Sequence, residues 1–181
     1  IRQELYRETK LGNIQSYGSG IYYFKNPILK YSFLPDPSIT FDEVIKQKYV
    51  FDKTNPDLFV YGYVSGQTFL NQIGISQQVP GKIEVTTNKT SSKKRVVCIT
   101  GRYAVLRKAR TEVNFMNYKI LQFLDMFHFL SYDDLLVNKQ LLSKYIKDNK
   151  FSKIEFNRYI NLYSTKTIKM IFESGLIYDF E

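Results

Sequence analysis

The stretch covering residues 63–89 is divided into short segments by residues that begin or end secondary structure. It reads YVSGQTFLNQIGISQQVPGKIEVTTNK. Ser65 is of a type that caps a helix, which we predict over residues 66–73. Gly74 is typical of the position just after a helix, and a Gln-Gln-Val-Pro turn then leads into a β-prone run over residues 82–87. We interpret the stretch as a strand–helix–strand unit whose main task is architecture.

Similar start and stop signals elsewhere predict an α+β fold with a small sheet and a helical C-terminal part. Thr40 and Glu43 form a capping-box pattern, which predicts a helix to about Val50. Apolar spacing near 3.6 residues dominates the last third of the chain. Strands are predicted at 58–64, 94–100 and 102–107, and helices at 114–130, 131–147, from Ser152 onward, and at 164–174.

The N-terminal segment combines a helix, a glycine and two β-prone runs. Residues 1–11 are good helix formers, and Gly12 stands at the expected helix end. Runs at 14–16 and 21–25 flank a Tyr-Gly-Ser-Gly turn, which predicts a hairpin. This order matches the second half of a winged helix-turn-helix, a recognition helix followed by its wing. The apolar stripe of the predicted helix over residues 1–11 is thin, so we expect that residues before Ile1 pack against it.

Domain boundaries follow from the prolines. Residues 27–38 hold three prolines and no periodicity, so we predict a linker there. The predicted domains are then residues 1–26, the C-terminal half of a winged helix-turn-helix, and residues 39–181, a mixed α/β domain.

Charge and the scarcity of metal ligands limit the function classes. A formal net charge of +9 favours a polyanionic partner such as DNA, although surplus lysines that only keep the protein soluble remain an alternative. One Cys and one His exclude a Cys/His zinc site and an intrachain disulfide. The most apolar stretch, 115–130, is interrupted by polar residues and does not read as a membrane span. We predict a cytoplasmic protein with no cofactor and no membrane partner.

The candidate DNA-binding residues lie on the first helix and in two later basic clusters. Arg and Gln read base edges, whereas Lys and Tyr suit phosphates. Basic clusters add salt-dependent affinity that is blind to sequence. The alternative for each group is a solvated surface. The candidates are Arg2, Gln3, Tyr6, Arg7, Lys10, Tyr17, Lys93, Lys94, Arg95, Arg107, Lys108 and Arg110.

Several of these segments together resemble the AbiEi family, the antitoxins and autoregulators of type IV toxin–antitoxin systems. The motifs that carry the resemblance are YVSG at 63–66, FLNQIGISQQVP at 69–80 and IEVTTN at 83–88. The run GSGIYYF at 18–24 is similar to the family's wing, and EVNFMNYKILQFLD at 112–125 to a family helix. The likeness covers roughly residues 1–126.

The resemblance implies an antitoxin that represses its own promoter at inverted repeats and counters a nucleotidyltransferase-type toxin. Such opposition does not require a stable complex. Phe69 stands where the family often has Ala, and Glu8 where an apolar residue usually braces the recognition helix. The first half of the helix-turn-helix is absent, so residues 1–181 alone are expected to bind DNA weakly.

Two other functions remain open from the sequence. One is a transcriptional regulator without a toxin partner. The other is a degenerate nuclease related to restriction endonucleases, because Asp57 is followed by Glu84, but Thr86 stands where the motif needs Lys and Lys89 is displaced. We predict no catalytic residue.

The remaining chemistry-bearing residues have structural interpretations. Cys98 lies in a run that reads as a buried strand, so we interpret it as an inert apolar residue. His128 lies in an apolar helix with no visible nucleophile beside it, and we interpret it as a core or flank residue.

Overall fold

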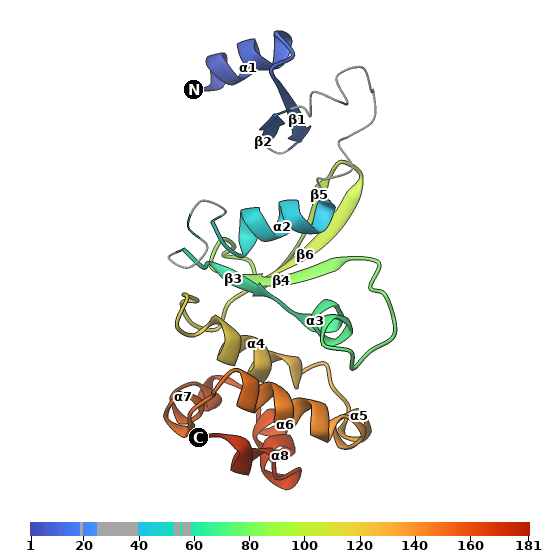
Figure 1. The fold of residues 1–181 in the computed structure, drawn as a ribbon, viewed down its shortest axis with the longest axis vertical. Helices are drawn as coiled ribbons and strands as arrows, with labels where there is room; N and C mark the ends of the chain where they lie inside the picture. The colour runs from blue at the N-terminus through green and yellow to red at the C-terminus, as the bar shows by residue number, and fades with distance from the viewer. Residues whose placement is uncertain (19, 25–39, 53–54, 56–58) are drawn as a thin grey trace.

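The computed structural model describes residues 1–18, 20–24, 40–52, 55 and 59–181. These residues form an α+β protein, as predicted. The molecule is elongated along one axis (Figure 1). A small N-terminal unit lies at one end, a four-stranded sheet lies in the middle, and short helices fill the other end. The predicted linker at 27–38, the predicted strand start at 58 and Asp57 lie outside the described residues.

The N-terminal unit consists of a helix and a hairpin, as predicted. Helix α1 spans Arg2–Lys10 and contains no buried residue. Strand β1 (Ile14–Gly18) pairs antiparallel with β2 (Ile21–Phe24). Gly12 lies just past the helix with φ +78°, a conformation that favours glycine and turns the chain into the hairpin.

The central sheet has the order β3-β4-β6-β5, formed by Gly62–Val64, Ile83–Thr87, Arg102–Lys108 and Lys94–Ile99. Only the β4–β6 pair is parallel. Strand β3 is shorter than predicted, because Val60 makes only an isolated bridge to Phe51. Strand β5 lies at the edge of the sheet, and most of its side chains are exposed.

Helices cover both faces of the sheet (Figure 1). Helix α2 (Phe41–Tyr49) begins at Thr40 with the predicted capping box and buries Phe41, Val44 and Ile45 on one face. Helices α3 (Gly66–Gln72) and α4 (Tyr118–Met126) pack on the opposite face. Two apolar cores result, one on each side of the sheet.

Two predicted helices differ from the observed ones because asparagine side chains compete for backbone groups. Buried Asn117 accepts from the Asn114 amide and donates to the Glu112 carbonyl, so α4 begins at Tyr118 rather than 114. Asn138 donates to the Asp134 carbonyl where the predicted helix 131–147 divides. The two pieces are α5 (Tyr132–Val137) and α6 (Lys139–Asp148).

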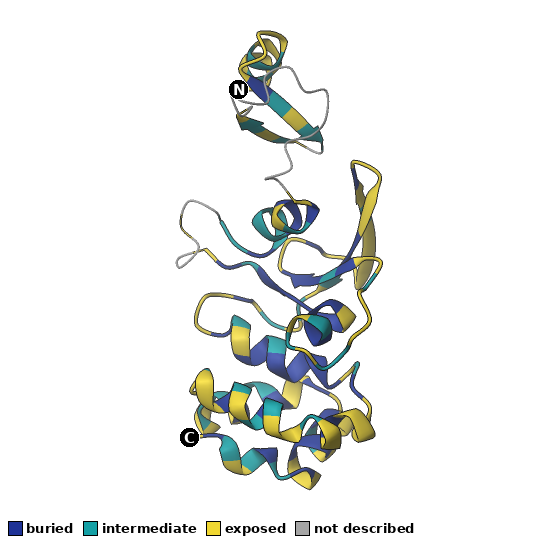
Figure 2. Cartoon of the chain, turned by 45° about the vertical axis from the view of Figure 1, so that its right-hand side comes forward, coloured by how far each residue is buried: buried dark blue, intermediate teal, exposed yellow. Residues whose placement is uncertain are grey.

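The C-terminal end is a layer of short helices with buried and exposed faces (Figure 2), and aromatic rings pack in its core. It comprises α5, α6, α7 (Lys153–Tyr159), α8 (Thr165–Glu173) and the short turns η2 (Ile160–Leu162) and η3 (Leu176–Asp179). The fully buried ring of Phe123 contacts Phe127, Tyr145, Phe151 and Phe180, with centroids 5.3–6.0 Å apart. No helix in the described ranges has the length and apolar character that crossing a membrane requires.

The hairpin contacts the sheet. Tyr17 and Ile21 pack against the core between α2 and the sheet. A Cβ on Gly18 would lie 3.6 Å from the Thr100 methyl group, so the hairpin lies against the β5–β6 turn. This contact, rather than any buried residue of α1, positions the N-terminal unit.

Candidate nucleic-acid interface

Helix α1 presents every predicted DNA-contacting side chain to solvent. Arg2, Gln3, Tyr6, Arg7 and Lys10 are all exposed. The Nζ atom of Lys10 lies 5.3 Å from the centre of the Tyr6 ring, which keeps these two side chains together. Glu8, on the same helix, accepts a hydrogen bond from the Asn13 amide. The helix therefore offers a continuous set of cationic and amide groups.

Tyr17 has a different position from the other candidates of the N-terminal unit. Its side chain is half-buried and packs against the core under α2. The ring therefore joins the hairpin to the sheet, a packing task that the sequence pattern did not indicate.

A second basic surface lies at the start of the edge strand β5. Lys93, Lys94 and Arg95 are exposed there, as the sequence predicted. Two further lysines lie close by in space. Partial burial, and then the nearby Arg95, lowers the pKa of Lys48. Burial and Lys48 likewise lower the pKa of Lys89, while Asp52 opposes this.

Lys89 is held in place by two contacts. Its Nζ donates to the Lys48 carbonyl at 3.0 Å and lies 3.7 Å from the centre of the Tyr61 ring. We call Lys48, Lys89, Lys93, Lys94 and Arg95 the β5 basic surface. Sequence reasoning missed Lys48 and Lys89 because 41 residues separate them.

The second predicted basic cluster is not assembled into this surface. Arg107 donates from Nε and Nη2 to Oε2 of Glu84, at 3.1 and 2.8 Å. Arg110 lies 3.8 Å from Asp125, donates to the Leu162 carbonyl and stacks 5.0 Å from the centre of the Tyr163 ring. Both guanidinium groups have partners within the protein, and Lys108 between them is exposed.

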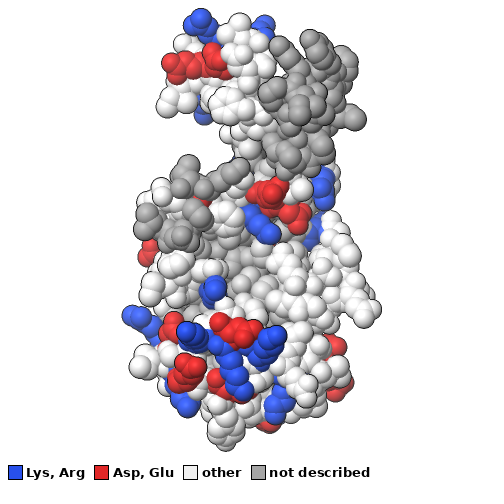
Figure 3. All heavy atoms as spheres, in the orientation of Figure 1, with Lys and Arg blue, Asp and Glu red and all other residues white. Residues whose placement is uncertain are grey.

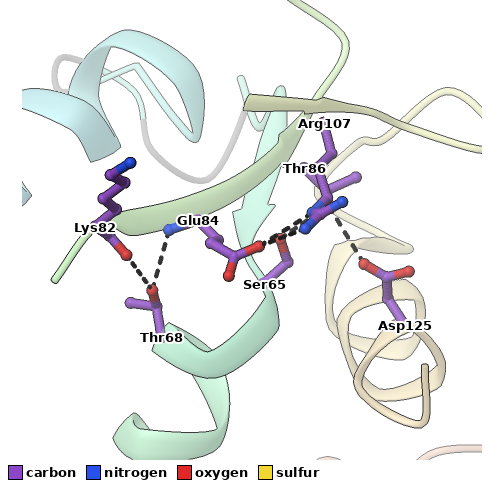
Figure 4. Close-up of polar contacts among 7 residues, drawn as sticks. All are labelled: Ser65, Thr68, Lys82, Glu84, Thr86, Arg107 and Asp125. Atoms are coloured by element: carbon purple, nitrogen blue, oxygen red, sulfur yellow. Dashed lines mark hydrogen bonds and ion pairs between the residues drawn. The ribbon is translucent and has the colours of Figure 1, made fainter. Parts of the chain in front are cut away.

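Figure 4 shows that Arg107 belongs to a polar cluster between the sheet and α4. The Thr86 hydroxyl oxygen lies 3.0 Å from Ser65 Oγ and 3.3 Å from Asp125 Oδ2, within hydrogen-bond distance of both. Ser65 precedes α3, as predicted, but its side chain makes no capping hydrogen bond. That part of the prediction is wrong, because the buried hydroxyl pairs with Thr86 instead.

Burial dominates the electrostatics of this cluster. Desolvation raises the pKa of Asp125, while Arg110 and the Thr86 hydroxyl act in the opposite direction. Burial also raises the pKa of Tyr63 and of Tyr163, whose hydroxyl donates to the Leu121 carbonyl at 2.9 Å. The cluster joins the sheet to the helical end through hydrogen bonds that span the chain.

Of the two carboxylates in the nuclease alternative, Asp57 lies outside the described residues and Glu84 is held in an ion pair. Glu84 binds Arg107, and Thr86 contributes a hydroxyl rather than an amine. Lys89 is part of the β5 basic surface, with its Nζ donating to the Lys48 carbonyl. In the described part of the chain, no three His, Cys, Asp or Glu residues are grouped so that they could hold a metal ion.

The sequence-based interpretation is wrong for Cys98 and agrees with the structure for His128. Cys98 is exposed, so its interpretation as a buried strand residue is wrong. Strand β5 is at the sheet edge, and Cys98 points away from the face that buries Ile99. His128 is an exposed flank residue whose ring meets Phe129 edge-on at 4.9 Å, consistent with the flank position that we expected.

Charge is distributed unevenly along the molecule. On the face shown in Figure 3, Lys and Arg at the helical end are interspersed with Asp and Glu. Ion pairs such as Lys147 with Asp179, at 2.9 Å, lie in that region. Mixed charge of this kind gives a weaker field than the clustered cations of the β5 basic surface.

Comparison with known proteins gives no information on the function of this chain. No family model, no curated protein and no solved structure matches this chain. The likeness to AbiEi antitoxins therefore rests on the sequence motifs alone.

Proposed function

We propose that this protein binds duplex DNA through α1 and the β1–β2 hairpin, and that it acts as an antitoxin that represses its own promoter. The observation that carries the proposal is the exposure of α1. A helix with no buried residue, bearing Arg2, Gln3, Arg7 and Lys10, is fixed at one end of the molecule by its hairpin. Such a helix is free to enter a major groove.

The chemistry of α1 suits base reading. Arg2 and Gln3 make bidentate hydrogen bonds with guanine and adenine edges, respectively. Lys10 contacts a phosphate, and the hairpin lies beside the sugar-phosphate backbone as a wing. The β5 basic surface supplies further phosphate contacts that are independent of sequence. Arg107 and Arg110 are left out of this interface because each has a partner within the protein.

The antitoxin part of the proposal rests on the resemblance to the AbiEi family. The larger domain would counter a nucleotidyltransferase-type toxin encoded beside it, without a required stable complex. Repression of its own promoter would keep the two proteins in balance.

Fluorescence anisotropy tests the DNA-binding part. The full protein, with any residues that precede Ile1, is titrated against duplex DNA from upstream of its own gene and against a scrambled duplex. The double variant Arg2→Ala/Gln3→Ala removes the base-reading pair. Lys139→Ala/Gln140→Ala is a matched control, because these two residues form a similar exposed basic–amide pair on α6.

The expected result is selective binding that the α1 variant weakens by tenfold or more, on the order of 1–3 kcal/mol per base contact. The α6 variant should bind like the unmodified protein. Equal affinity for both duplexes would contradict base reading.

Co-expression tests the antitoxin part. Rescue of growth when this protein is produced with the neighbouring toxin gene supports the proposal. Promoter binding without rescue would instead favour a regulator with no toxin partner. Mg²⁺-dependent DNA cleavage that Glu84→Ala abolishes would favour the nuclease alternative.

A further inference from the structure

A mixed polar and aromatic cleft lies beside α3 and the chain that leads from it into β4. It has a volume of about 350 Å³. Its walls come from the first turn of α2, from α3, from the turn at 79–81 and from the β5–β6 turn. The groups that matter most are Asp42, Thr68, Gln72, Pro80, Arg102 and Tyr103.

One end of the cleft is suited to an anion. The guanidinium of Arg102 stacks 4.8 Å from the centre of the Phe41 ring. Stacking uses the face of a guanidinium and leaves its N–H edge free to bind a phosphate. Lys82 lies nearby, with Nζ 5.7 Å from the centre of the Tyr103 ring, and adds a second positive charge at the rim.

The other groups in the cleft suit a sugar and a base. Asp42 is a half-buried carboxylate, which accepts hydrogen bonds from ribose hydroxyls. Exposed Gln72 offers both a donor and an acceptor to a base edge. The rings of Tyr103 and Pro80 provide flat apolar surface for a base.

The walls are held in place by the motif residues. The Thr68 hydroxyl donates to the Lys82 carbonyl at 3.4 Å and accepts from the Glu84 amide at 3.0 Å. Asn71 donates to the Ser76 carbonyl at 3.0 Å, which fixes the loop that follows α3. The cleft is therefore largely formed in advance, as ligand sites usually are.

We propose that this cleft binds a mononucleotide, with its phosphate at Arg102, its ribose at Asp42 and its base against Gln72 and Tyr103. The volume lies in the range typical of small-ligand sites, roughly 300–1,000 Å³. A guanidinium for the phosphate, a carboxylate for the ribose, and an amide with an aromatic ring for the base face one space and match the three parts of such a ligand. This proposal does not depend on DNA binding by α1.

Isothermal titration calorimetry of the full protein with AMP, GMP, CMP and UMP tests the proposal. At least one should bind at concentrations up to about 1 mM, a free energy near −4 kcal/mol. Arg102→Ala should weaken that nucleotide about tenfold or more, because a hydrogen bond to a charged group is lost. The same variant should leave the matching nucleoside unaffected. Arg158→Ala, an exposed arginine on α7, is the control.

Two further variants separate a ligand contact from a loss of folding. Gln72→Ala changes an exposed side chain and should weaken the nucleotide and its nucleoside equally. Asp42→Asn should weaken the ribonucleotide more than its 2′-deoxy form. Circular dichroism checks that each variant is folded. If Arg102→Ala does not fold, Arg102→Lys, which keeps the positive charge, shows whether residue 102 can be changed without loss of the fold. The proposal is overturned if none of the four nucleotides binds, or if binding survives both Arg102→Ala and Gln72→Ala unchanged.

Discussion

The carboxylate of Glu84 lies against the Cα of Gly66, in the space that a side chain at residue 66 would need. A Cβ on Gly66 would lie 2.6 Å from Cδ of Glu84. The carboxylate is not free to move aside, because two nitrogens of Arg107 donate to it. Gly66 also has φ +61°, which favours glycine. The glycine is therefore required both by its own backbone and by the Glu84–Arg107 ion pair.

Replacing Gly66 with Ala should destabilise the protein by about 2–4 kcal/mol, because backbone strain and a steric clash combine. Gly74→Ala is the control, since Gly74 has φ +82° but nothing within 4 Å of an added Cβ. That variant should lose only about 1 kcal/mol from strain. Urea unfolding measures both losses. Similar losses of unfolding free energy at the two positions would show that the Glu84 carboxylate moves aside at little cost.

Replacing Thr40 with Ala should cost about 1 kcal/mol of stability, because the Thr40 hydroxyl accepts from the Glu43 amide at 3.2 Å and caps α2. Thr40→Ser keeps the hydroxyl and should lose much less. Thermal unfolding of the two variants provides the measurement. Equal melting temperatures for the two variants would argue that the cap contributes little.

Replacing Asp125 with Asn should make the stability of the protein less dependent on pH. Burial raises the pKa of Asp125 above its ordinary value of 3.8, so the folded state holds the proton more tightly than the unfolded state. The charged form therefore costs stability above the folded pKa, and that cost disappears as the pH falls toward 3.8. Asp125→Asn should be more stable than the unmodified protein at pH 7, with a difference that closes near pH 4 in urea titrations. A constant difference across this range would contradict the pKa shift.

Replacing Lys93, Lys94 and Arg95 together with Ala should reduce the salt dependence of DNA binding and leave its sequence preference intact. Each lost phosphate contact lowers the slope of log K against log salt by about 1. Anisotropy titrations across a salt series measure the slope on both duplexes. Arg107→Ala should instead lower stability, because it leaves Glu84 without its partner. An unchanged slope in the triple variant would show that these three residues do not contact the DNA phosphates.

Cys98 should react with a thiol reagent in the native protein. The residue is exposed on the edge strand β5, so labelling requires no unfolding. Mass spectrometry after a short pulse of iodoacetamide, with and without urea, gives the comparison. Labelling that occurs only in urea would show that Cys98 is buried in the native protein.

Signals that act within a few residues were read correctly from the sequence. The capping boxes at Thr40 and Ser152 begin helices as predicted, because both partners lie three residues apart. The apolar spacing near 3.6 residues predicted helices in the last third of the chain, and helices are found there. The break at Asn138 was missed, since its side chain competes for a carbonyl within an otherwise helical pattern.

The sequence by itself determined the α+β class, the hairpin, most element starts and the basic residues of α1, because each depends on local backbone preference or spacing. Only the tertiary structure decided which charges have partners. It directed Arg107 to Glu84 and brought the Lys89 amine to the Lys48 carbonyl, contacts between residues far apart in the chain. It also placed Cys98 outward, because strand order decides which strand is an edge. Burial and charge pairing are properties of the assembled fold, and spacing along the chain does not encode them.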